Sequence, residues 1–177
     1  MLRLVTLYGI VAGLIVCTHL VWIVVSPADV HMDRGYVYGY GTMIVALTAV
    51  FLGIKHYRDK VLGGVIGFGQ AVVVGLGISL VASIVYVVGW ELCLAISGYG
   101  FGSVYAQAMV DAARQKGASS AELERVVADG EAFAKNYANP LYRMPITFIE
   151  IFPVGVLITL ISAAVLRNSR VLPARAA

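Results

Sequence analysis

Three ionisable side chains interrupt otherwise apolar stretches of this sequence: His19, Glu91 and Glu150. A carboxylate or an imidazole within an apolar segment is costly unless it is paired, protonated or hydrated, so such groups commonly serve proton transfer or ion coupling. At 1.5 Å per helical residue, all three lie roughly 8–9 Å below the same end of the helices predicted to carry them. Their common depth predicts one shared polar layer in which at least one acid is protonated.

Several interpretations of this layer are open. The two acids meet each other and share a proton, or protonated His19 is the counter-ion of one of them. In a purely structural alternative, each glutamate extends toward the headgroups and His19 bonds a neighbouring carbonyl. Pro153 and Gly155 follow Glu150, and Pro153 removes a helical hydrogen bond, which predicts a bend beside the acid.

The elements that must position these residues are predicted to be membrane-spanning helices. Hydrophobic residues make up 60% of the chain, charged residues make up 13%, and the mean hydropathy is +0.86. A helix of about 20 apolar residues crosses the hydrocarbon core of a bilayer. Runs of that length with at most one charge predict an all-α, polytopic protein with four spans in a single membrane domain, residues 1–177. The spans are about 4–25, 36–54, 70–96 and 144–166.

Two connections differ from ordinary loops. The glycine-rich segment 62–69 weakens helix propensity, and we predict that it is interfacial or re-entrant. Residues 103–137 predict an amphipathic helical hairpin between the third and fourth spans, with Gly117 ending its first helix and Ser119 and Glu122 forming a capping box. Its apolar face, which includes Val127, is expected to lie on the bundle, the headgroups or a partner.

A compact basic turn follows the second span. Its members are Lys55, His56, Tyr57, Arg58 and Lys60. Basic residues concentrate in short cytoplasmic loops, and each one near anionic lipid contributes about 1 kcal/mol, so anchoring explains the turn better than specific headgroup recognition. We therefore expect both termini in the cytoplasm and the hairpin outside.

Small residues four positions apart allow close helix contacts, as at Gly9 and Gly13 in the first span. Packing within one chain explains this pattern best, and a homo-oligomer or another membrane protein is the alternative partner beside the lipid bilayer. The net charge of +3 forms no extended basic stripe, which argues against nucleic acid.

Motifs that would indicate an enzyme are absent. The sequence contains no H-E-x-x-H, no G-x-x-x-x-G-K-[ST] and no G-x-S-x-G. Cys17 and Cys93 lie in predicted spans without a C-x-x-C pattern. We predict no catalytic residue, no cofactor and no metal site.

Three stretches resemble a bacterial membrane family catalogued as domain of unknown function 4199. They are F-L-G-I-K-H-Y-R-D at 51–59, Gly64 with F-G-Q-A at 68–71 and Gly75, and F-I-E-I-F-P-V-G at 148–155. The resemblance covers most of the chain from the second span onward. It implies a bacterial origin, a four-helix membrane domain and no established activity.

The sequence favours a non-enzymatic accessory or assembly component of the inner membrane. The alternative is a transporter for a small molecule, a lipid or a proton-coupled substrate that uses His19, Glu91 and Glu150. A transporter predicts a cavity reaching the two acids between the first, third and fourth spans, whereas a scaffold predicts a dry and internally paired layer.

Overall fold

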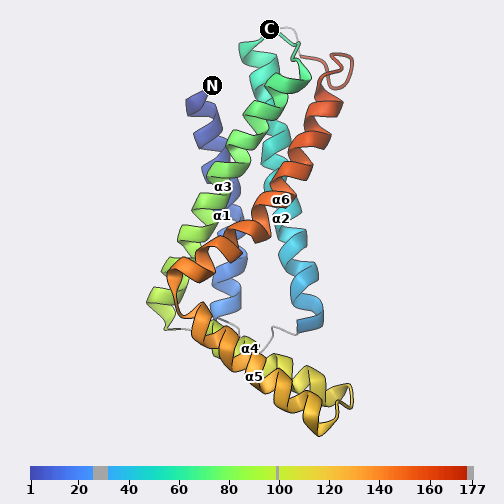
Figure 1. Cartoon of the computed structure of the whole chain (residues 1–177). Helices are drawn as coiled ribbons and strands as arrows, with labels where there is room; N and C mark the ends of the chain where they lie inside the picture. Colours follow the sequence, from blue (N-terminus) through green and yellow to red (C-terminus); the bar gives the residue numbers. More distant parts are fainter. Residues whose placement is uncertain (26–31, 99, 175–177) are drawn as a thin grey trace.

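The computed structural model describes residues 1–25, 32–98 and 100–174, and in these residues the chain forms six α-helices and no strand. The helices are α1 (Leu2–Val25), α2 (Met32–His56), α3 (Phe68–Ser97), α4 (Phe101–Gln115), α5 (Ser120–Tyr137) and α6 (Pro140–Leu166). Helices α1, α2, α3 and α6 form an elongated bundle, and the α4–α5 hairpin projects from one end of it (Figure 1). The predicted all-α architecture, with a hairpin between the third and fourth spans, is confirmed.

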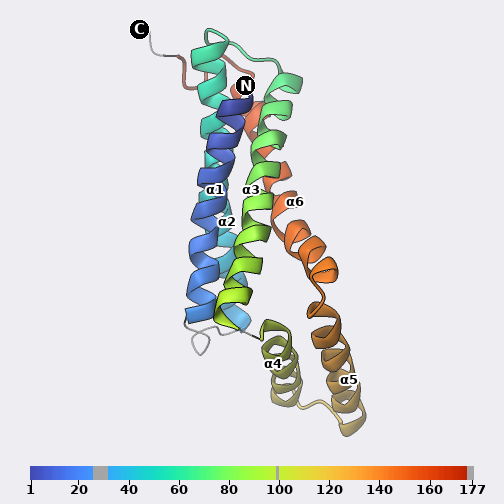
Figure 2. The ribbon, with the colours of Figure 1, turned by 90° about the vertical axis from the view of Figure 1, so that its left-hand side faces the viewer.

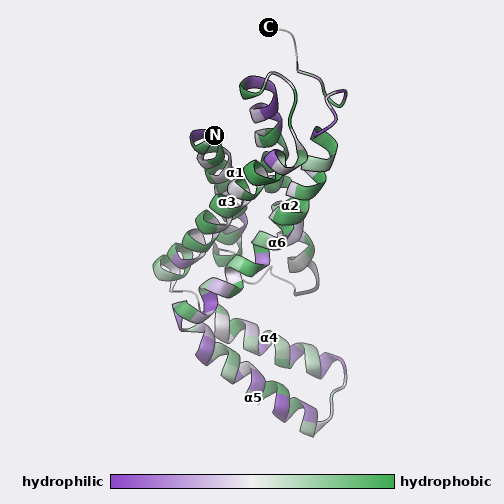
Figure 3. Ribbon diagram, turned by 45° about the horizontal axis from the view of Figure 1, so that its top comes forward, coloured by the Kyte–Doolittle hydropathy of each residue, from purple (hydrophilic) through white to green (hydrophobic). Residues whose placement is uncertain are grey.

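Four helices are long and apolar enough to cross a membrane. Their most apolar windows have mean hydropathies from 1.8 to 2.5, and Figure 3 shows that the bundle is predominantly hydrophobic whereas the hairpin is mixed. Each span is a little longer than its charge-free run predicts. At 1.5 Å per residue, the 30 residues of α3 extend about 45 Å, more than the roughly 30 Å of a hydrocarbon core.

Small residues permit the closest helix contacts in the bundle interior. A Cβ atom on Gly13 would lie 2.5 Å from Cβ of Val85, so the backbone of α1 contacts a side chain of α3 directly at this point. A Cβ atom on Gly155 would lie 2.7 Å from Cβ of Ser79, which brings α6 equally close to α3. The predicted small-residue stripe of α1 therefore packs within the chain. Large apolar side chains such as Leu14 and Leu157 point outward, as expected of a lipid-facing surface.

Helix α6 begins at Pro140, four residues before the predicted span. Asn139 caps it, because its side-chain oxygen accepts a hydrogen bond from the N–H of Leu141 at 3.0 Å. Pro145 and Pro153 both lie inside the helix, and α6 changes direction along its length (Figure 2). The bend predicted at Pro153 agrees with this course, since Pro153 offers no N–H to the carbonyl of Ile149.

The connection between the second and third spans differs from its prediction. A π-helical turn, η2 (Tyr57–Val61), extends α2, and residues 62–67 then lead directly into α3. Gly63 and Gly64 adopt positive φ angles of 69° and 101°, which only glycine adopts easily. The re-entrant alternative is wrong, because so short a turn reverses the chain at the end of the bundle that also carries the termini (Figure 1).

The hairpin folds largely as predicted. Gly117 ends the α4 region at a φ of 75°, and Ser119 and Glu122 form the capping box of α5. The backbone N–H of Ser119, donated to the Glu122 carboxylate at 2.8 Å, holds the pKa of Glu122 below its usual range. Close contacts at Gly130 and Ala106 join the two helices to each other.

At Val127 the hairpin's apolar face does not lie on the bundle, whereas Tyr137, at the end of the same helix, contacts Trp90 of α3. Val127 is 39% exposed, since the hairpin projects away from the four spans instead of folding back along them. The bundle is therefore excluded as the surface that covers Val127. Contact with headgroups or a partner stays a prediction.

Candidate functional site

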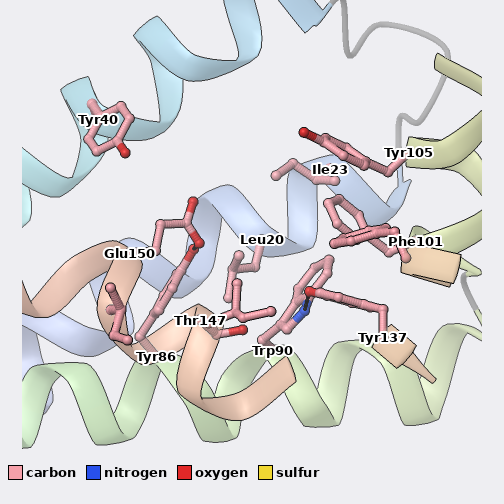
Figure 4. A pocket seen from close by; sticks show the side chains of 13 residues that line it. Leu20, Ile23, Tyr40, Tyr86, Trp90, Phe101, Tyr105, Tyr137, Thr147 and Glu150 are labelled. Carbon is pink, nitrogen blue, oxygen red and sulfur yellow. Dashed lines mark hydrogen bonds between the residues drawn. The ribbon is translucent and has the colours of Figure 1, made fainter. Parts of the chain in front are cut away.

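A pocket of about 480 Å³ lies where the bundle meets the hairpin, at the end opposite the termini (Figure 4). Its walls come from α1, α2, α3, the hairpin and α6, and they are mostly aromatic and aliphatic. The lining residues are Leu20, Ile23, Tyr40, Tyr86, Trp90, Phe101, Tyr105, Phe133, Tyr137, Ile146, Thr147, Ile149 and Glu150. A volume of this size is typical of small-molecule sites.

Aromatic rings close the hairpin side of the pocket. Trp90 of α3 meets Phe101 of α4 edge to face, with ring centroids 5.3 Å apart, and Phe101 lies 5.2 Å from Tyr137 of α5. The indole N–H of Trp90 donates a 2.8 Å hydrogen bond to the Tyr137 hydroxyl. Burial raises the pKa of Tyr137, so this hydroxyl is neutral. The aromatic contacts hold the hairpin on the bundle.

Glu150 occupies the other side of the pocket. The Tyr86 hydroxyl of α3 donates a 3.4 Å hydrogen bond to its carboxylate, and Tyr40 of α2 lies on the facing wall (Figure 4). Among the described residues that line the pocket, Glu150 is the only carboxyl, and none is a lysine, an arginine or a histidine. The pocket thus presents one acidic group within an aromatic and aliphatic surface.

Glu91 has a different environment. Arg143 binds its carboxylate with two donors, Nε at 2.6 Å and Nη2, and Nη1 also donates to the carbonyls of Tyr137 and Ala138. Both side chains are largely covered, with 18% of Glu91 and 15% of Arg143 exposed. This ion pair fastens α3 to the junction of α5 and α6, which is a structural role.

The structure does not bring His19, Glu91 and Glu150 together. The ring of His19 stacks on Trp22 of the same helix with centroids 5.8 Å apart, Glu91 pairs with Arg143, and Glu150 meets Tyr86. The predicted fourth span, 144–166, left Arg143 outside the membrane. In the structure α6 begins at Pro140, so Arg143 lies in its first turn, at the level of Glu91. Protonation of Glu150 stays a prediction.

Only part of the basic turn folds inward, at Tyr57 and Arg58. Arg58 is fully buried, and its guanidinium donates to the Asp59 carboxylate at 2.6 Å, to the carbonyls of Val171 at 2.9 Å and Leu166 at 3.4 Å, and to that of Leu172. Lys55 pairs with Asp59 at 2.5 Å.

The other members of the turn have separate environments. His56 accepts from or donates to the Tyr8 hydroxyl at 3.1 Å, Tyr57 is buried, and Lys60 is exposed. Arg58 was expected to be a lipid-facing anchor, but it instead fastens the segment after α6 to η2.

Sequence reasoning found Glu150 but missed the pocket around it. A usable signal exists, because Tyr86 and Trp90, Phe101 and Tyr105, and Phe133 and Tyr137 are each spaced four apart and share a helix face. Which of these faces converge depends on how the hairpin folds onto the bundle. Within the described residues, no three His, Cys, Asp or Glu side chains gather in a group that could hold a metal ion.

The chain is a polytopic helical membrane protein, because it has four long apolar helices that pack through small residues. An aromatic pocket with one acidic residue lies at one end of this bundle. The chain belongs to the family described as "Protein of unknown function (DUF4199)", whose model matches residues 7–168. No curated protein and no solved structure matches the chain.

Proposed function

We propose that this protein is a non-enzymatic accessory component of a bacterial inner membrane that binds an apolar or amphipathic small molecule in the aromatic pocket. The observation that carries the proposal is the pocket itself: about 480 Å³, walled by rings and aliphatic side chains, with a single carboxyl group. An apolar body would replace contacts with lipid by contacts with aromatic rings, and the polar groups would orient it.

Binding is favoured over passage through the bundle by the packing beyond Glu150. There α3 and α6 are in direct contact, with Gly155 against Ser79 and Gly75 against Thr159, and the Ser79 and Thr159 hydroxyls lie 3.3 Å apart. Ile151 is fully buried beside this contact. A transporter would have to separate α3 and α6 at these glycines in each cycle, so transport is the second candidate.

The orientation that we propose places the termini in the cytoplasm and the pocket near the outer surface. Lys60 and Arg167 are exposed at the end of the bundle that carries the termini, where the positive-inside rule favours the cytoplasm. The hairpin and the pocket lie at the opposite end. A ligand would then enter from the outer leaflet or from the space beyond it.

Filling the pocket tests the proposal. In lipid nanodiscs, the wild-type protein should bind tritiated phenylbutanol saturably above the background of empty nanodiscs. Ile146 lines the pocket, and Ile146→Trp should weaken this binding about tenfold, or about 1.4 kcal/mol, because the indole would occupy volume that the ligand needs.

Leu157→Trp is the matched control, since Leu157 is an exposed residue of the same helix and does not line the pocket. This variant should bind as the wild type does. Equal loss in both variants, or no saturable binding to the wild type, would overturn the proposed function.

A further inference from the structure

The charges around the pocket are unbalanced. Glu150 lines it, and the described lining residues include no basic side chain. Arg143 lies in the first turn of the same helix, α6, but its guanidinium already binds Glu91 and the carbonyls of Tyr137 and Ala138. The Glu150 carboxylate therefore accepts a hydrogen bond from the Tyr86 hydroxyl. Within the described part of the chain, it forms no hydrogen bond or ion pair with a basic side chain.

A carboxylate in an apolar setting is stabilised most by a positive charge beside it, and an anion in the same pocket would be repelled. The aromatic walls add to this preference. Ring faces attract cations, and Tyr86 lies directly beside the carboxylate while Tyr40 faces it from α2 (Figure 4).

The rest of the pocket suits hydrocarbon. Trp90 and Phe101 close the far side, and Leu20 contributes aliphatic surface between the rings and Glu150 (Figure 4). Ile146 also lines the pocket. A ligand lying along the pocket would have its polar end at Glu150 and its apolar end against the rings.

We infer that the ligand of this pocket is a lipophilic cation: one amine or quaternary ammonium group on an apolar body small enough for about 480 Å³. This inference rests on the proposed function and narrows it. The ammonium group lies beside the Glu150 carboxylate, on the side that Tyr40 faces from α2, and the apolar body extends toward Trp90.

A pair of probes that differ only in charge tests the inference. They are phenylbutyl-trimethylammonium and its isostere with carbon in place of the nitrogen, measured on the full chain in nanodiscs of zwitterionic lipid, with empty nanodiscs subtracted. The wild type should bind the cation about tenfold more tightly than the isostere, which is within the range of a cation–π contact plus a charge pair at the exposed Glu150 side chain.

Glu150→Gln should reduce this preference to about threefold or less and leave the affinity for the neutral isostere unchanged. Glu124→Gln is the matched control, because it removes an exposed carboxylate of the hairpin that does not line the pocket; it should retain the preference for the cation.

The outcomes separate the two proposals. If cation and isostere bind the wild type equally, the inference fails while the proposed function stands, and if neither binds, both fail. Should Glu150→Gln fail to fold, the wild type is tested with phenylvalerate, an anion of similar size. Binding of this anion as tight as that of the isostere would overturn the inference.

Discussion

Arg58→Met is expected to destabilise the protein by about 3–5 kcal/mol and to release the segment that follows α6. Arg58 is fully buried, and its donors serve the Asp59 carboxylate and the carbonyls of Leu166, Val171 and Leu172. Methionine fills a similar volume but donates nothing, so the partly covered Asp59 carboxylate keeps only Lys55 as a partner and three carbonyls lose a donor.

Thermal unfolding and trypsin digestion measure the two effects. Arg167 and Arg170 are exposed on the released segment, so cleavage there should accelerate at least about tenfold if the segment detaches. Lys60→Met is the control, because Lys60 belongs to the same η2 turn but is exposed. If Arg58→Met is cleaved as slowly as the wild type and is equally stable, the Arg58 guanidinium does not hold the segment that follows α6.

Arg143→Gln should cost about 2–3 kcal/mol, the buried-pair penalty reduced for the partial exposure of both side chains. The substitution leaves Glu91 without its cation and the carbonyls of Tyr137 and Ala138 without a donor, at the point where α3, α5 and α6 meet. The hairpin should therefore become more sensitive to protease, and the unfolding temperature should fall.

The double variant Glu91→Gln with Arg143→Gln should recover part of this loss, because no uncompensated charge remains. Arg114→Gln is the matched control: Arg114 pairs with Asp111 at 3.4 Å, both side chains are well exposed, and the expected cost is at most about 0.5 kcal/mol. If the two arginine variants cost the same, the Glu91–Arg143 pair has no special structural role.

The four spans were predictable because lipid imposes a simple requirement on sequence. A helix in hydrocarbon needs a run of apolar side chains of fixed length, and the charge-free runs of this chain have that length. The capping box at Ser119 and Glu122 was predictable for a similar reason, since its hydrogen bonds are local.

The partners of the charged residues could not be predicted in the same way. Arg58 binds three carbonyl groups, and a carbonyl leaves no trace in the amino-acid sequence. Arg143 was placed outside the membrane because the charge-free run begins at Met144, whereas Asn139 and Pro140 start the helix earlier and bring Arg143 level with Glu91. The depth of Glu91 and Glu150 in their helices therefore predicted that each makes a polar contact, but it did not predict that the partners are Arg143 and Tyr86.

The pocket was missed because faces of all six helices must converge to form it. Tyr86 and Trp90 share a face of α3, but nothing local to α3 indicates that Phe101 and Tyr137 of the hairpin meet that face. The aromatic spacings within single helices thus identify the candidates, and only the packing of the hairpin on the bundle assembles them.

Photolabelling tests most directly whether the pocket is a ligand site. A diazirine analogue of phenylbutanol is photolysed with the wild-type protein in nanodiscs, with and without a large excess of unlabelled phenylbutanol, and the modified residues are identified by mass spectrometry. We predict that the excess ligand suppresses labelling of Trp90, Tyr137 and Thr147, which are buried and line the pocket, but not of the lipid-facing Leu157. Labelling that is suppressed nowhere, or equally at Leu157 and in the pocket, would contradict the proposal that this protein binds a small molecule between its bundle and its hairpin.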